Sequence, residues 1–151
     1  MKLGVVGVIV GLAFLPMTAD AAKYQVINAT AEVMTLMDME SIHPRKPYTR
    51  VWVTVVFPKP LLGVSFTKNL QDMDCDEKRF RIIARSSYDE TGKSTAVPEP
   101  SSDWQYAVPG TTGEGMVKLA CGEPPSRRPF EVPDVEMLRV YREGIRTGII
   151  K

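Results

Sequence analysis

Few side chains of this chain have the types and spacing that covalent or acid–base chemistry requires. Its 151 residues include one histidine, His43, and two cysteines, Cys75 and Cys121. That set is too small for a zinc site built from nitrogen and sulfur ligands, and a Ser/His/Asp triad would depend on His43. His43 precedes Pro44, which favours an exposed turn, and no serine lies in a nucleophile elbow. We therefore predict that the protein is not an enzyme and uses no cofactor or metal ion.

Three aspartates at alternate positions resemble the start of a calcium-binding loop. They are Asp72, Asp74 and Asp76. An EF-hand loop that begins at Asp72 needs glycine at its sixth position and glutamate at its twelfth, where this chain has Glu77 and Ile83. We therefore interpret these aspartates as a solvated, acidic end of a strand.

Charged residues of both signs are nearly balanced. Lys and Arg number 19 and Asp and Glu 18, for a net charge of +1, so the chain lacks the basic excess that binding to nucleic acid requires. Two groups of basic residues could still contact an acidic protein partner or a sulfated glycan, or simply be solvated surface. These groups are Arg45, Lys46 and Arg50, and then Arg127 and Arg128.

The first 21 residues have the pattern of a cleaved signal peptide. Met1 and Lys2 precede an uncharged apolar run over residues 3–15, which is too short to cross a membrane as a helix. Pro16 follows, and the segment Ala19-Asp20-Ala21 presents small residues where signal peptidase needs them. We expect cleavage after Ala21, and after Ala22 as the second choice. The protein is then exported, with no integral membrane span.

Export also determines how the two cysteines are interpreted. An oxidising compartment outside the cytoplasm permits disulfides, and two cysteines without metal-binding partners favour pairing. We predict a Cys75–Cys121 disulfide that braces a domain of modest size.

The rest of the pattern consists mostly of strands. We predict strands over residues 33–42, 50–57, 64–73 and 80–88, the second being the strongest because nearly all of its residues are β-branched or aromatic. The aromatic side chains of Trp52 and Trp104 are expected in the core. The methionines near residue 37 are expected to fill gaps in the core.

Two helices are predicted toward the C-terminus. Thr111 and Glu114 form a capping-box pattern at the start of a short helix that ends near Cys121, although Gly113 and Gly115 weaken it. A Pro-rich linker over residues 122–129 precedes a second helical pattern that begins at Pro133. The predicted fold is a single α+β domain, with an antiparallel sheet, one or two helices packed on one face, and one disulfide.

An ordered set of residues resembles the surface-adhesin protein E family of Gram-negative bacteria. The set consists of residues 37–42 (MDMESI), Val51-Trp52, Asp74-Cys75, Arg79, Arg81, Tyr88, Trp104, residues 108–111 (VPGT) and Cys121. The resemblance implies a domain of antiparallel strands with a packed helix, placed here at residues 22–122, and bridged cysteines. It also implies adhesion to extracellular-matrix and serum proteins of the host. Residues 123–151 are then a Pro-rich linker and a C-terminal tail that is helical in part.

Two functions remain open at this point. The first is an exported, non-enzymatic protein of the cell surface that binds host protein through a sheet edge, a basic loop or its tail. The second is a soluble periplasmic structural or assembly factor, in which residues 132–150 dock on another envelope protein as an amphipathic helix. Both have a protein partner, and the oligomeric state, a dimer included, is left open.

Overall fold

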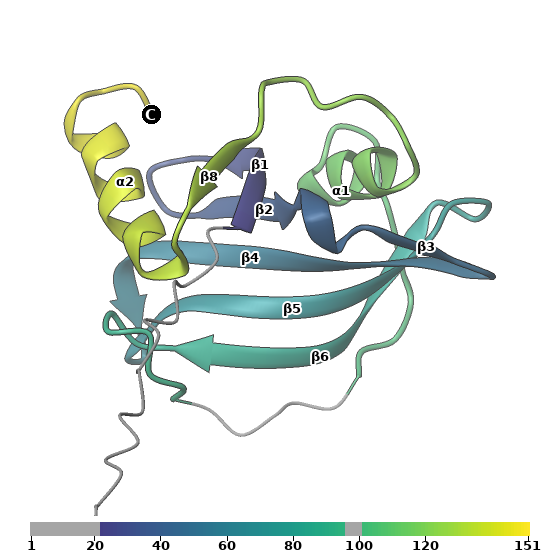
Figure 1. Ribbon diagram of the computed structural model, residues 1–151, viewed down its shortest axis with the longest axis horizontal. Helices are drawn as coiled ribbons and strands as arrows, with labels where there is room; N and C mark the ends of the chain where they lie inside the picture. Colours follow the sequence, from purple (N-terminus) through teal and green to yellow (C-terminus); the bar gives the residue numbers. More distant parts are fainter. Residues whose placement is uncertain (1–21, 96–100) are drawn as a thin grey trace, which may run out of the picture.

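The computed structural model describes residues 22–95 and 101–151. The predicted signal peptide, residues 1–21, lies outside the described residues. Within them the chain forms an antiparallel sheet with two α-helices and one disulfide, so the predicted α+β class is confirmed (Figure 1).

The sheet has the strand order β7-β6-β5-β4-β2-β1-β8, and β3 pairs with β4. The strands are β1 (Ala22–Ala29), β2 (Met34–Asp38), β3 (His43–Arg45), β4 (Tyr48–Leu61), β5 (Val64–Asp74), β6 (Arg79–Tyr88), β7 (Gln105–Tyr106) and β8 (Phe130–Val132). The predicted strands at 50–57, 64–73 and 80–88 fall within β4, β5 and β6. The one predicted at 33–42 is divided into β2 and a 3-10 turn, Met39–Ser41.

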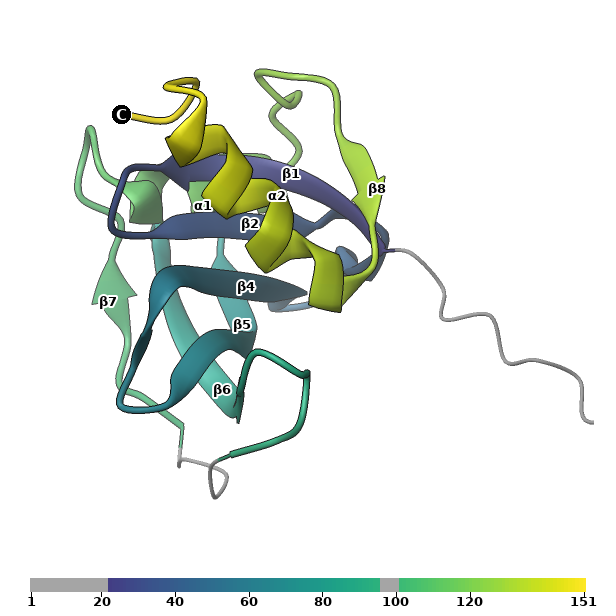
Figure 2. The same cartoon turned by 90° about the vertical axis from the view of Figure 1, so that its left-hand side faces the viewer.

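The two helices pack on opposite faces of the sheet. Helix α1 (Thr112–Ala120) covers a core cluster that includes Met37, Val51 and Val53, whereas helix α2 (Asp134–Arg146) covers one that includes Leu36 and Val56. Met37 pairs with Val53 and Leu36 with Thr54, and neighbouring residues of a strand point to opposite faces. The division differs from the predicted packing on one face because both side-chain sets of β2 and β4 are largely apolar. Figure 2 shows α2 in front of β1 and β2.

Helix α1 approaches the sheet closely because two of its residues are glycines. Thr111 is the N-cap and accepts a hydrogen bond from the Glu114 N–H, while the Glu114 carboxylate accepts one from the Gly110 N–H. A Cβ at Gly113 would lie 2.8 Å from the Phe80 ring, and one at Gly115 would lie 3.0 Å from Ile27. The glycines that weaken the helix in the sequence therefore permit its packing.

The disulfide joins the end of β5 to the end of α1. Cys75 follows Asp74, Cys121 is the C-cap of α1, and their Cα atoms are 5.7 Å apart. The predicted Cys75–Cys121 bridge is confirmed, and it holds α1 against the face that α1 covers.

The C-terminal segment belongs to the same sheet and core. β8 pairs with β1, and α2 contributes Met137, Leu138 and Tyr141 to the core cluster on its face. The Tyr141 hydroxyl donates a hydrogen bond of 2.6 Å to the carbonyl of Thr30 in the β1–β2 turn. The helix expected after Pro133 is present as α2, with its apolar side buried.

Candidate functional site: an aromatic and arginine face

Part of the α2-covered face of the sheet carries arginines, aspartates and aromatic rings instead of aliphatic side chains. Pairing brings Arg50 of β4 opposite Asp72 of β5, and Asp72 opposite Arg81 of β6. The next row places Asp74 opposite Arg79, which is opposite Tyr106 of β7. We define the aromatic–arginine face as Tyr48, Arg50, Trp52, Asp72, Asp74, Arg79, Arg81, Trp104 and Tyr106.

Asp72 is the buried centre of the first row. Arg50 donates two hydrogen bonds to its carboxylate, of 2.7 and 3.1 Å, and Arg81 donates one of 3.2 Å. Burial by itself raises the pKa of Asp72, but the hydrogen bonds and charges of Arg50 and Arg81 outweigh it and hold the pKa below its usual range. The charged carboxylate thus fixes both guanidinium groups.

Asp74 has a similar role in the second row. Its carboxylate accepts hydrogen bonds from Arg79 Nε at 3.0 Å and from the Glu77 N–H at 3.1 Å. Burial raises the pKa of Asp74, but these two hydrogen bonds, the charge of Arg79 and a hydrogen bond from the Asp76 backbone together hold the pKa below its usual range. The interpretation of the aspartates as a solvated strand end is wrong for Asp72 and Asp74, because neighbouring strands supply arginines that make their burial favourable; Asp76 is exposed.

Trp104 connects the two rows through its ring. The guanidinium carbons of Arg79 and Arg81 lie 4.8 and 4.6 Å from its centroid, within the range of cation–π contacts. Tyr48 packs against Trp104 with ring centroids 4.8 Å apart. Arg81 Nε is buried and has no hydrogen-bond partner among the described residues. The rings and guanidinium groups therefore form one packed layer whose outer side is open to solvent.

Trp52 lies on the same face, beside a hollow. The hollow is lined by Ser41, His43, Pro44, Arg45, Arg50, Trp52 and Leu70. Trp52 and Trp104 are half-buried and are absent from both core clusters. The prediction that they are core residues is wrong, because Trp52 points away from the set formed by Val51 and Val53, at an end of the sheet where α2 does not cover the described residues.

The structure separates the two predicted basic groups. Arg45 is exposed and lines the hollow with Arg50, and Lys46 is exposed in the β3–β4 hairpin. Arg127 and Arg128 are exposed in the loop before β8, the edge strand opposite β7. Arg50 is held by Asp72, and Arg45 lies beside Arg50 on this face. The group at residues 45–50 therefore adjoins the aromatic–arginine face, whereas Arg127 and Arg128 do not.

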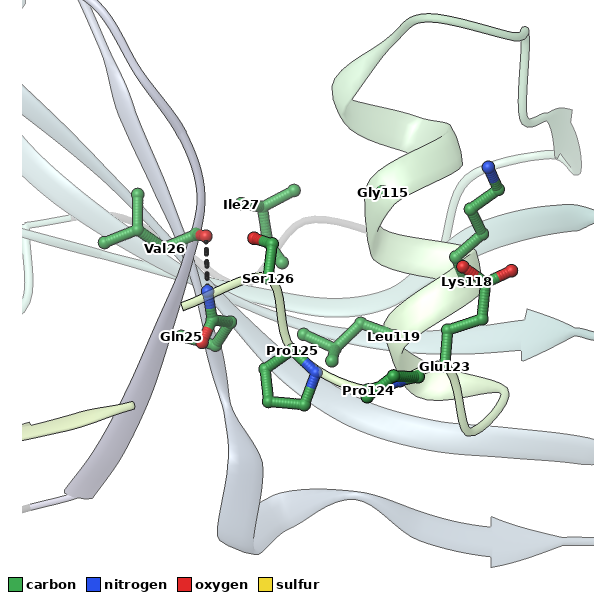
Figure 3. A pocket seen from close by; sticks show the side chains of 10 residues that line it. All are labelled: Gln25, Val26, Ile27, Gly115, Lys118, Leu119, Glu123, Pro124, Pro125 and Ser126. Carbon is green, nitrogen blue, oxygen red and sulfur yellow. Dashed lines mark hydrogen bonds between the residues drawn. The ribbon is translucent and has the colours of Figure 1, made fainter. Parts of the chain in front are cut away.

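A second hollow lies between β1, α1 and the Pro-rich loop (Figure 3). Gln25 is buried there, and its side-chain amide donates a 2.9 Å hydrogen bond to the Val26 carbonyl. Figure 3 shows Pro125 between Gln25 and Leu119. The Gln25 amide thus occupies the carbonyl of Val26, and Pro124 and Pro125, which have no N–H to donate, also line the hollow.

The composition of the aromatic–arginine face is that of a binding surface. Trp, Tyr and Arg are the residues most enriched at the energetic centres of protein interfaces. Among the described residues no group of three or more His, Cys, Asp or Glu side chains is placed to hold a metal ion. No helix within residues 22–95 and 101–151 is long and apolar enough to span a membrane.

Sequence reasoning missed most of this face, although a signal for it was present. Arg79 and Arg81 alternate on one strand, and Asp72 and Asp74 alternate on the strand before it. Antiparallel pairing across the short turn between them places each arginine opposite an aspartate. The alternating aspartates by themselves indicate only an acidic strand end, and their pairing with β6 is what places the arginines opposite them.

Comparison with known proteins gives one match. The model of a family described as surface-adhesin protein E matches residues 24–122. No curated protein and no solved structure matches the chain. The matched range includes every member of the aromatic–arginine face and both cysteines.

Proposed function

The chain belongs to the surface-adhesin protein E family, and from this premise we propose that it is an exported, non-enzymatic adhesin of a Gram-negative cell envelope. Its partners are proteins of the host extracellular matrix or serum. The aromatic–arginine face is the contact surface, and it is the observation that carries the proposal beyond family membership.

Two properties of this face support binding to protein. Its arginines are held in place by Asp72 and Asp74, so little side-chain entropy is lost when a partner contacts them. Its rings are partly open to solvent, and Tyr106 is 65% exposed. Rigid aromatic and arginine side chains with free outer surfaces supply large contact area at low entropic cost.

The docking helix that suggested a periplasmic assembly factor is already packed within this chain. That alternative used residues 132–150 as an amphipathic helix in a groove of a partner. Met137, Leu138 and Tyr141 of α2 are buried in the core of this chain, so its apolar side is already occupied. A periplasmic partner would have to bind elsewhere, and no other surface of the described residues combines aromatic and arginine side chains in this way.

The proposal is tested by location and by binding. Intact producing cells are treated with protease, with a periplasmic protein as the lysis control. The adhesin is expected to be cleaved while the control survives. Purified mature protein is then passed over immobilised basement-membrane extract and serum proteins, and binding is expected to fall at least tenfold in Trp104→Ala and in Tyr106→Ala.

A matched control separates the face from general surface changes. Arg139 is an exposed arginine of α2 that pairs with Glu136, and Arg139→Ala is expected to leave binding unchanged. The surface location would be refuted if the chain on intact cells resisted the protease as the periplasmic control does, while the same protein released from the cells was cleaved. Equal binding by Tyr106→Ala, Trp104→Ala and the native protein would remove the aromatic–arginine face as the contact.

A further inference from the structure

The turn between β4 and β5 exposes two leucines at its apex. Leu61 is 60% exposed and Leu62 is 97% exposed. Leu62 and Gly63 form the two-residue turn, with φ angles of 51° and 81°. Figure 1 shows this turn at the left-hand end of the sheet, below α2.

Leucine at this position opposes the stability of the folded chain in two ways. A two-residue turn with positive φ at both positions normally has Asn-Gly or Asp-Gly, and a leucine in the left-handed region is strained. Its apolar side chain also remains in water. Departures from local rules of this kind concentrate at functional positions.

The base of the hairpin is tied to α2, and the apex lies beyond this contact. Arg142 of α2 donates a 2.7 Å hydrogen bond to the carbonyl of Pro58. The pairing of β4 with β5 is irregular between Val56 and Leu61, where Pro58 and Pro60 lack N–H groups. A Cβ at Gly63 would meet no atom within 4 Å, so the apex is surrounded by solvent.

The charge carried by the turn's own residues is positive, whereas the residues of other elements beside its base, Glu32, Glu90 and Arg142, bring charges of both signs. Residues 57–68 include Lys59 and Lys68 and no aspartate or glutamate. Lys68 is paired with Asp134 of α2, whereas Lys59 is exposed at the base of the turn, in a hollow that Glu32 and Arg142 also line. A cation just below an apolar apex matches an anionic headgroup above an acyl layer.

We propose that the Leu61–Leu62 apex inserts into an anionic lipid surface, with Lys59 at the level of the headgroups. The apex is convex and carries two adjacent leucines, so only a fluid surrounding can cover it on all sides. A lipid layer is such a surrounding. Two leucines and one lysine give weak, reversible attachment. The proposal goes beyond adhesion to host protein, because it uses an end of the sheet that is separate from the aromatic–arginine face.

Sedimentation of the mature protein with vesicles tests this proposal. Vesicles of phosphatidylglycerol and phosphatidylcholine in equal parts are compared with vesicles of phosphatidylcholine alone. The native protein is expected to bind the anionic vesicles. Leu62→Asn is expected to lower the partition coefficient roughly tenfold or more, and Lys59→Ala roughly fivefold on the anionic vesicles alone.

Two further measurements keep the result specific. Ile149→Asn is the matched control, because Ile149 is also 83% exposed but lies after α2, and it should bind vesicles as the native protein does. Leu62→Asn should also melt at a higher temperature, because asparagine accepts the left-handed turn. Loss of binding by Leu62→Asn with this gain in stability supports insertion.

Two outcomes would overturn the proposal. One is absence of binding by the native protein to both kinds of vesicle; weaker binding of Leu62→Asn to immobilised host protein would in that case assign the apex to a protein pocket. The other is an equal loss in Leu62→Asn and Ile149→Asn.

Discussion

Reduction of the Cys75–Cys121 disulfide should destabilise the fold by an amount that the structure sets. The two cysteines are 46 residues apart in the sequence, and in the chain-entropy description closing a loop of this length stabilises the native state by about 4 kcal/mol. The bridge is also the covalent link between α1 and the sheet, whose close packing relies on Gly113 and Gly115. For a domain of this size we expect the melting temperature to fall by about 10–15 °C.

Thermal unfolding followed by circular dichroism measures this difference. The native protein is compared with and without a reductant, and with the variant Cys75→Ser/Cys121→Ser. The variant should melt near the reduced protein and should not respond to reductant, which controls for effects of the reductant itself. A shift of less than about 2 °C, or a reductant effect on the variant, would refute the entropic argument.

Two other predictions concern the packing of the sheet. Asp72→Asn should lower the free energy of unfolding by about 1–2 kcal/mol at neutral pH, because Arg50 and Arg81 lose their shared carboxylate. The pKa of Asp72 in the folded state lies below its unfolded value of about 3.9. The stabilisation by the Asp72 carboxylate is therefore present above about pH 4 and is lost as the pH falls through the folded-state pKa. Urea titrations in which Asp72→Asn lowered the free energy of unfolding equally at neutral and strongly acidic pH would contradict this role of Asp72. Gly113→Ala should destabilise by about 1–2 kcal/mol despite the better helix propensity of alanine, because its Cβ meets the Phe80 ring. Gly144→Ala brings its Cβ to 2.8 Å from Cδ1 of Ile150, the far end of a flexible side chain, and should therefore destabilise less than Gly113→Ala in the same urea series.

The sequence predicted well those features that depend on local chemistry. The β-branched run of β4 and the alternating pattern of β6 predict strands without any knowledge of the strands beside them. The Thr111 cap set the start of α1, because capping uses groups within one turn. The pairing of Cys75 with Cys121 followed from compartment and count.

The candidate site was harder to predict because it depends on which face is covered. Alternation divides β4 into two sets of side chains but does not say which helix packs on either set. Val51 and Val53 meet α1, whereas Trp52 and Arg50, in the other set, lie beyond the part of their face that α2 covers. From the sequence alone, a tryptophan within an apolar strand is therefore predicted to be a core residue.

The C-terminal segment determines how much of that face is open. Residues 24–122 match the family, while Val132, Met137, Leu138 and Tyr141, which complete the core over Leu36 and Phe66, come after the matched range. Asp134 at the start of α2 accepts a hydrogen bond from the buried Tyr24 hydroxyl. Burial, followed by this contact, raises the pKa of Tyr24 well above its usual range, so the hydroxyl keeps the proton that it donates at neutral and mildly alkaline pH. Helix α2 is thus fixed over the Val56 end of the sheet. The same face near Asp72 is left to arginines and aromatic rings, which pack against one another and leave their outer surfaces open to solvent.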